Sequence, residues 1–166
     1  TGDLTLSFST LTQNLADSNF GGAGNGALFI NDLGEGTILV SSSIIAQNLD
    51  GSGLDRRARG SSSQLFPDVA EDSGNISGGY NLIGDEDGST SFVEEGDMAG
   101  DSINPLDALL GDLLYNGGPT PTCAISANSP AYNAADPLNF VQADQRGISR
   151  PQDGTHYRKT GDPVLR

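Results

Sequence analysis

The chain has 166 residues, and its 35% of hydrophobic and 18% of charged residues are the composition of one folded domain rather than of a disordered segment. Its net charge of −14 would repel phosphate backbones and anionic lipid surfaces, so we expect no nucleic-acid partner and no membrane-surface partner. No run of apolar residues approaches the roughly 18 that a membrane span needs. We therefore expect no membrane span in this chain.

The first 49 residues contain an internal repeat of about 34 residues. Identical residues recur in the same order in the two copies: Gly2, Ser7, Ser9, Gln13, Asn14 and Leu15 correspond to Gly36, Ser41, Ser43, Gln47, Asn48 and Leu49. Apolar residues step by two inside each copy, which is typical of short β-strands. A repeat of this size indicates stacked supersecondary units. The predicted fold class is therefore all-β, a right-handed parallel β-helix whose last coils end in an irregular C-terminal cap.

Each copy of the repeat predicts two short strands with a bend between them. The strands fall within residues 4–13 and 37–47, and a further strand over 27–31 follows a glycine-rich turn. We expect the first coil to be open, so that an N-terminal coil of the same or a longer chain could stack on it. Asn14 and Asn48 should lie at the same corner of adjacent coils, where their amides can form a hydrogen-bond ladder. The apolar side chains expected to point inward are Leu4, Leu6, Ile38, Val40 and Ile45.

Residues 1–100 form the predicted coil domain, which a long loop interrupts at about 50–74. This loop carries the only basic cluster of the acidic chain, Arg56, Arg57 and Arg59. Arginines in a loop can bind a carboxylated or sulfated glycan. The sequence favours instead ion pairs with nearby acidic residues such as Asp55 or Glu71. The trio is therefore both a candidate ligand loop and a candidate structural element.

An acidic segment follows a further predicted coil at 76–84. Asp85, Asp87 and Ser89 alternate in a way that resembles a calcium-binding loop, because hard cations prefer several oxygen ligands on one tight turn. An EF-hand loop would have glycine at the position of Thr90 and glutamate at that of Gly96, and the chain has neither. The two hypotheses are a Ca²⁺ site and a solvated acidic loop.

Residues 101–166 form the predicted cap and tail. The segment 105–114 is expected to form a short helix, and the proline-rich stretch 116–122 an irregular turn. Asp144, Arg146 and Arg150 could form an acid with two anion-binding groups, or ion pairs and hydrogen bonds that clamp the cap strand to the coil; the surrounding Pro, Gly and Gln favour the clamp. Cys123 is the only cysteine, so we expect a small buried residue there rather than a disulfide or a catalytic thiol.

Five motifs follow one another along the chain: 41–48, Gly79-Tyr80-Asn81-Leu82-Ile83-Gly84, 116–122, Ser129-Pro130-Ala131 and 144–151. In this order they resemble the choice-of-anchor Q family, bacterial right-handed β-helix surface proteins that are similar also to the repeats of polymorphic outer-membrane proteins. The likeness covers nearly the whole chain to about Gln152, and residues 154–159 depart from the family pattern of an acidic strand there. The resemblance implies a secreted protein or a protein of the bacterial outer surface, anchored by a route that this terminus leaves open.

Two functions are compatible with these features. The first is a non-catalytic structural and adhesive segment of an extracellular protein, with self-association or a glycan as its partner. The alternative is the C-terminal part of a polysaccharide lyase or hydrolase whose active site lies in a missing N-terminal portion. The predicted strands carry neither facing carboxylates nor the bases that such chemistry needs, and the only His and Lys, His156 and Lys159, lie in the tail. The sequence therefore favours the first function.

Overall fold

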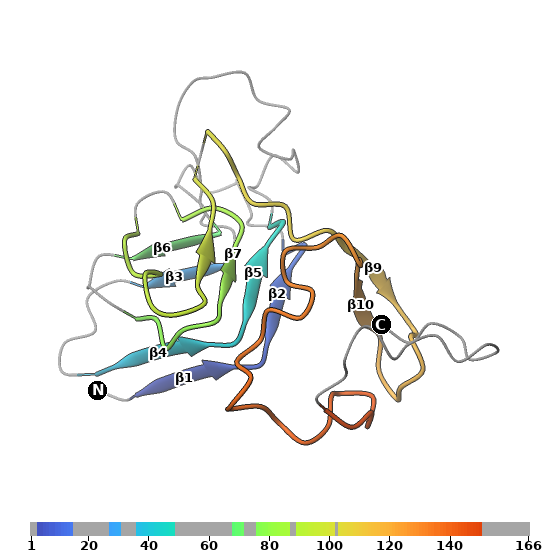
Figure 1. Ribbon diagram of the computed structural model, residues 1–166. Helices are drawn as coiled ribbons and strands as arrows, with labels where there is room; N and C mark the ends of the chain where they lie inside the picture. Colours follow the sequence, from blue (N-terminus) through green and yellow to red (C-terminus); the bar gives the residue numbers. More distant parts are fainter. Residues whose placement is uncertain are drawn as a thin grey trace. The chain divides into compact units, whose positions relative to one another are not determined.

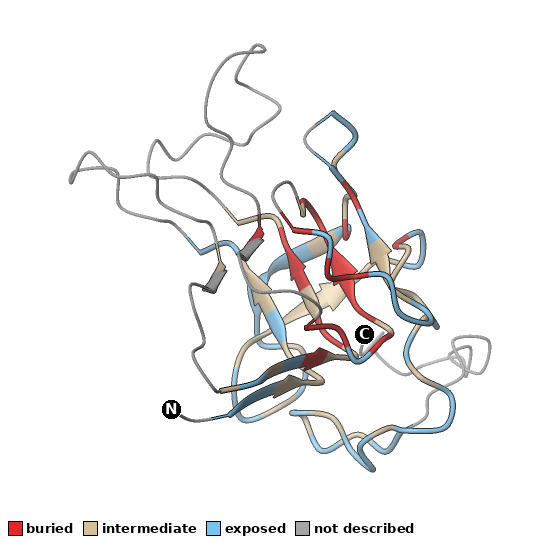
Figure 2. Ribbon diagram, turned by 90° about the vertical axis from the view of Figure 1, so that its left-hand side faces the viewer, coloured by how far each residue is buried: buried red, intermediate tan, exposed pale blue. Residues whose placement is uncertain are grey.

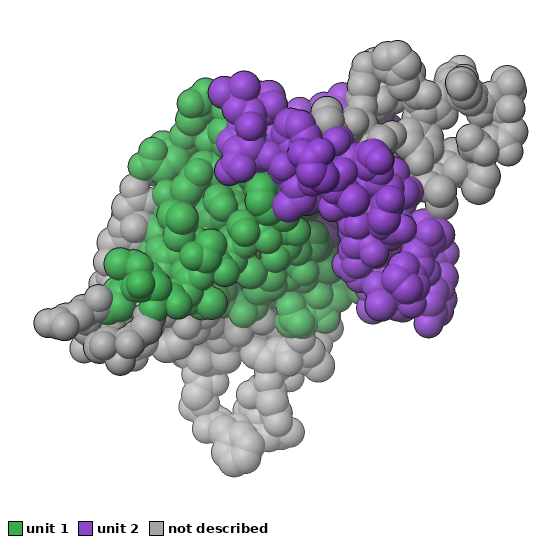
Figure 3. Space-filling model, turned by 90° about the horizontal axis from the view of Figure 1, so that it is seen from below, with its two compact units in different colours: residues 1–107 green, residues 108–166 purple. Residues whose placement is uncertain are grey.

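The computed structural model describes residues 3–14, 27–30, 36–48, 68–71, 76–86, 89–101 and 103–150 (Figure 1). Ten strands and no helix occur within these ranges. No helix there is accordingly long and apolar enough to cross a membrane. The chain divides into two compact units, residues 1–107 and residues 108–166, which Figure 3 colours separately.

Eight of the short strands lie in the first unit, and all their pairings are parallel. They form the two-stranded sheets β1-β4 and β3-β6 and the four-stranded sheet β2-β5-β7-β8. The strands are β1 (Leu4–Ser7), β2 (Thr10–Thr12), β3 (Leu28–Ile30), β4 (Ile38–Ser41), β5 (Ile44–Ala46), β6 (Val69–Glu71), β7 (Leu82–Ile83) and β8 (Met98–Ala99).

The internal repeat appears in the structure as the register of the parallel strands. Leu4 pairs with Ile38 along β1-β4, and Leu11 pairs with Ile45 along β2-β5. Each residue of β1 and β2 therefore lies beside its own counterpart in the second copy. The strands expected within residues 4–13 and 37–47, and the strand expected at 27–31, are confirmed.

The bends between paired strands lie at equivalent positions and share an unusual backbone conformation. Phe8, Ser42 and Tyr80 have φ angles of 51°, 47° and 58°, in the left-handed region that costs a residue with a side chain about 1–2 kcal/mol. Phe8 and Ser42 each follow the first strand of a repeat, and Tyr80 precedes β7. The same sharp corner thus precedes each of β2, β5 and β7, three neighbouring strands of one sheet, and keeps these strands in register.

The core of the first unit lies on one face of these strands. Val40, Ile45, Val69 and Ile83 are fully buried, and Ile76 and Phe92 complete the cluster. The strand that begins beside the N label in Figure 2 is mostly pale blue and tan, whereas buried residues concentrate in the strands that follow it. Of the side chains expected inside, Leu6 and Ile38 pack against the core, but Leu4 is 50% exposed because β1 is the outermost strand.

The second unit contains an antiparallel hairpin in place of the predicted helix at 105–114. Strand β9 (Leu110–Leu114) pairs with β10 (Thr122–Ile125), and the register shifts between Cys123 and Ile125. A helix of this length is marginal in isolation, and Gly111 lowers its propensity further. The ladder with β10 satisfies the backbone hydrogen bonds instead, so the helix prediction is wrong.

The predicted fold class, a right-handed parallel β-helix, is also wrong. The described residues form four small sheets of two to four strands, three parallel and one antiparallel, and no closed solenoid is seen among them. The repeat predicts pairing between its copies, and this pairing is present. A continuous coil requires more, because every strand must also pair with a strand of the following layer, whereas among the described residues β4 has only the isolated bridge between Val40 and Ser77 there and β6 has no further strand partner.

Candidate functional site

A recurring arrangement of asparagines holds the layers of the first unit together. In each instance, an asparagine donates from both its backbone N and its Nδ2 to one side-chain oxygen of a neighbouring segment, and we call this arrangement an asparagine rung. Asn14 donates in this way to Oδ1 of Asn48, at 3.1 and 2.9 Å. Asn48 donates to Oδ1 of Asp68, at 2.9 and 2.7 Å. The predicted ladder between Asn14 and Asn48 is confirmed. Asp68 is a third member of this ladder, and it was not predicted because residues 50–74 were expected to form a loop.

The third asparagine rung is buried in the unit. Asn81 is fully buried and donates from N and Nδ2 to Oδ1 of Asp97, at 2.9 and 3.0 Å. Its Nδ2 also lies 3.0 Å from the carbonyl oxygen of Val40, and its Oδ1 accepts the backbone N–H of Ser43 at 3.1 Å. One side chain therefore connects three segments that are far apart in the sequence.

Asp97 is committed to the same network. Its Oδ2 accepts the hydroxyl of Ser77 and, at 2.9 Å, the backbone N–H of Glu94. A carboxylate whose two oxygens receive this many hydrogen bonds has a structural role, because a substrate or metal ion would have to displace them. The asparagine rungs thus align strands and bring no reactive group to the surface.

The calcium hypothesis concerned Asp85, Asp87 and Ser89. Asp85 and Ser89 are both buried, at 4% and 8% exposure, and the Ser89 hydroxyl accepts the backbone N–H of Ser91 at 3.2 Å. Asp87 lies outside the described residues. Within those residues, no group of three or more His, Cys, Asp or Glu side chains is placed to hold a metal ion. The Ca²⁺ site therefore stays a prediction.

The candidate ligand loop also stays a prediction. Arg56, Arg57 and Arg59 lie outside the described residues. The structure consequently favours neither the glycan nor the ion-pair interpretation of this trio.

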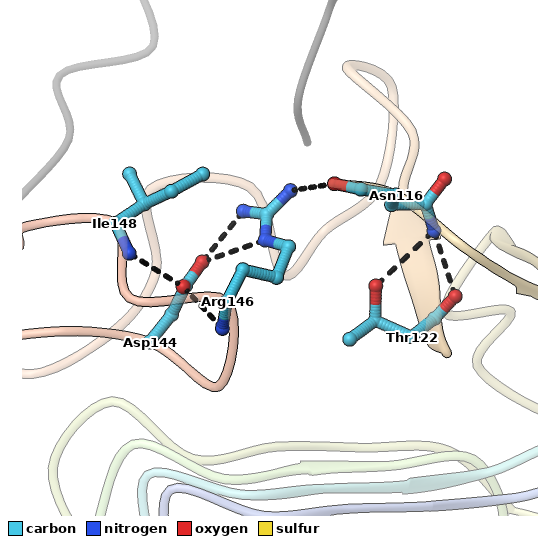
Figure 4. A network of polar contacts seen from close by, with 5 residues as sticks. All are labelled: Asn116, Thr122, Asp144, Arg146 and Ile148. Atoms are coloured by element: carbon cyan, nitrogen blue, oxygen red, sulfur yellow. Dashed lines mark hydrogen bonds and ion pairs between the residues drawn. The ribbon is translucent and has the colours of Figure 1, made fainter. Parts of the chain in front are cut away.

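In the second unit, Asp144 and Arg146 form the ion pair expected from the sequence (Figure 4). Oδ2 of Asp144 accepts Nη2 and Nε of Arg146 at 2.6 and 2.9 Å. Oδ1 accepts the backbone N–H groups of Arg146 and Ile148 at 2.8 and 3.0 Å. Burial raises the pKa of Asp144, but these hydrogen bonds and the charge of Arg146 outweigh it, so the pKa lies below its ordinary value.

The same pair connects two segments of the second unit. Nη1 of Arg146 points to the carbonyl oxygen of Asn116 at 3.4 Å, and Asn116 in turn donates to the carbonyl oxygen of Thr122 at 2.7 Å, as Figure 4 shows. Arg150 takes part through its backbone N–H, which donates to the carbonyl oxygen of Gln142 at 2.9 Å. Within the described ranges, the Arg150 side chain has no ion-pair partner. The geometry is that of a clamp between segments 116–122 and 142–150, rather than of an acid flanked by two anion-binding groups. The ion pair is confirmed, but these contacts lie within the second unit, so a clamp of the cap strand onto the coil stays a prediction.

Cys123 lies half-buried on β10. Burial, and then the negative charge of Asp112, raise the pKa of the Cys123 thiol. A nucleophilic cysteine needs the opposite shift, because the thiolate is the reactive species.

Comparison of the chain with models of known protein families, with curated proteins and with solved structures finds no match. The resemblance to the choice-of-anchor Q family therefore stays a prediction.

Proposed function

We propose that this chain is a structural and adhesive segment of an extracellular protein and carries out no chemistry of its own. The observation that carries the proposal is the use of polar side chains inside the fold: Asn81, which is buried, and Asp97 and Asp144, which are partly buried, are all held in networks that join one strand or loop to another. Polar groups arranged in this way stabilise a surface without exposing a nucleophile or a base.

Two further features support an extracellular location. The net charge of −14 keeps a protein soluble and repels nucleic acid and anionic lipid. The first unit is held together by backbone ladders and asparagine rungs between layers, so it needs no disulfide. Such a protein can stay folded outside the cell, although its single cysteine cannot form an internal disulfide.

The proposal is tested with the purified chain and a panel of pectate, alginate and chondroitin, each with and without Ca²⁺. We expect binding or no interaction, but no unsaturated products and no new reducing ends. A variant with Arg56, Arg57 and Arg59 all replaced by glutamine tests whether the predicted ligand loop binds the acidic glycans. A chain with Arg158, Lys159 and Arg166 replaced by glutamine is the matched control, because it loses the same three positive charges elsewhere. Turnover that disappears on replacement of a residue of this chain would refute the proposal.

A further inference from the structure

The outer edge of β1 and β2 has no strand paired to it among the described residues. Strand β1 pairs only with β4, and β2 is the first strand of the order β2-β5-β7-β8. Leu4 and Phe8 direct their N–H groups toward the β4 side, to the carbonyl oxygens of Thr37 and Ser41 at 2.9 and 3.2 Å. Because alternate residues of a parallel strand bond to opposite sides, Thr5 and Ser7 direct theirs outward. We call this outer side, with the corresponding side of β2, the open edge.

The next layer shows what such an edge binds. Val40 in β4 donates to the carbonyl oxygen of Ile76 at 2.8 Å and accepts the N–H of Gly78 at 2.7 Å, so each interior strand bonds on both sides. Strands β4 and β5 receive β1 and β2 in parallel, residue by residue, over both copies of the repeat. At the open edge, the N–H and C=O groups of alternate residues face outward in the same way as those of β4 face the segment that contains Ile76 and Gly78.

Side-chain acceptors repeat along with the backbone. Ser43 Oγ accepts the N–H of Ser9 at 3.2 Å, and Oδ1 of Asn48 accepts both donors of Asn14. The equivalent acceptors at the open edge are Ser9 Oγ and Asn14 Oδ1. In the part of the chain that the structure describes, no hydrogen bond reaches Asn14 Oδ1. The open edge therefore has an unused asparagine rung position at its end.

We propose that the open edge binds an extended strand in parallel, and that the occupant is a segment with the pattern of the repeat itself, two short strands followed by Asn. The asparagine supplies the two donors that Asn14 Oδ1 can accept, and apolar residues at alternate positions cover Leu4, which is 50% exposed. Two copies of this chain related by a two-fold axis would pair their edges antiparallel, which places Asn14 far from its counterpart. A repeat-type strand satisfies both the backbone and Asn14, and a second copy does not.

The test measures binding of a synthetic peptide that copies residues 2–15 to the purified chain by fluorescence anisotropy. If the peptide binds as β1 and β2 bind their neighbours, its N–H groups at the positions of Leu6 and Leu11 face the protein, and those of Thr5 and Thr10 face away. N-methylation at the first two positions should weaken binding at least tenfold, and N-methylation at the last two should change it less than twofold. Replacement of the peptide asparagine by alanine should weaken binding about tenfold.

Protein variants test the same site from the other side. Thr5→Pro removes an outward N–H, which an edge strand tolerates, and should abolish binding, whereas the matched Thr5→Val keeps this N–H and should bind normally. Thermal melts of both variants show whether they fold, and the peptide series remains decisive if Thr5→Pro does not. Three outcomes would overturn the proposal: absence of binding, equal effects of the two pairs of N-methyl groups, or a dimer of the wild-type chain in sedimentation that Thr5→Pro dissociates. The site extends the structural role proposed above, but the assay contains no glycan, so its failure is distinguishable from failure of that role.

Discussion

Replacing Asn81 by alanine removes the side chain that connects three segments of the first unit. The buried N–H of Ser43 then loses its acceptor, at a cost of about 1–3 kcal/mol. Loss of the charge-assisted bond from Nδ2 to Asp97 costs about 1.5–3 kcal/mol more. The carbonyl oxygen of Val40 still accepts the N–H of Gly78, so its lost bond to Asn81 adds little to the loss of stability. We expect a loss of about 3–5 kcal/mol in the free energy of unfolding, a large part of the roughly 5–15 kcal/mol typical of a domain.

Urea unfolding followed by circular dichroism measures this loss, and hydrogen exchange at Ser43 reports its mechanism. The matched control is Asn81→Asp, which keeps the acceptor for Ser43 N–H but places a second carboxyl beside Asp97. Burial and that neighbouring charge would raise the pKa of the new carboxyl, so the variant should be most stable below the ordinary aspartate value of about 3.9 and lose stability as pH rises through the raised pKa. Ser43 exchange should accelerate in Asn81→Ala and stay slow in Asn81→Asp at low pH. A loss below about 1 kcal/mol in Asn81→Ala, with unchanged exchange, would refute the reasoning.

Further predictions concern the corner, the clamp and the thiol. Ser42→Gly relieves a φ of 47° and should unfold at or slightly above the wild-type urea midpoint, whereas Ser42→Val should lose about 1–2 kcal/mol; equal midpoints would contradict the strained corner. The lowered pKa of Asp144 contributes stability above the ordinary aspartate pKa that disappears as pH falls through the folded value. Asp144→Asn should therefore melt below wild type near neutral pH and approach it in acid, and a gap independent of pH would argue against the ion pair. Because burial and Asp112 raise the pKa of Cys123, its alkylation at pH 8 should be slower than that of a free thiol, and Asp112→Asn should accelerate it; an unchanged rate would exclude the charge effect.

The sequence predicts local pairing well where the two copies of the repeat match. Identical residues at equal offsets made the register of β1 on β4 and the contact of Asn14 with Asn48 predictable, because parallel neighbours with the same pattern bury the same face. The ion pair of Asp144 with Arg146 was also predictable, since two residues separated by one position can close a tight turn. These features depend on short-range patterns or on direct repetition.

The remaining features depend on partners that no pattern marks. Asp97 accepts hydrogen bonds from Asn81 at a separation of 16 residues, which does not match the repeat of 34, so no period in the sequence connects the two residues. The apolar residues of Leu110–Leu114 are compatible with a helix, and the segment forms a strand because it pairs with β10. The fold class was wrong for a related reason: the repeat predicts the pairing between its own two copies, whereas β4 and β6 lack a continuing strand beyond the second copy among the described residues.

The connections between paired strands vary in length while the pairing does not. Ser9 meets Ser43 at a separation of 34 residues, Ser43 meets Asn81 at 38, and Asn81 meets Asp97 at 16. The register of the strands is thus determined by the contacts between them and does not depend on the length of the chain that connects them. Lengthening a flexible connection costs only about 0.6 kcal/mol for each doubling. The connections are therefore sites where insertions can accumulate during evolution, or where a foreign peptide can be grafted and displayed, without shifting the strands that carry it.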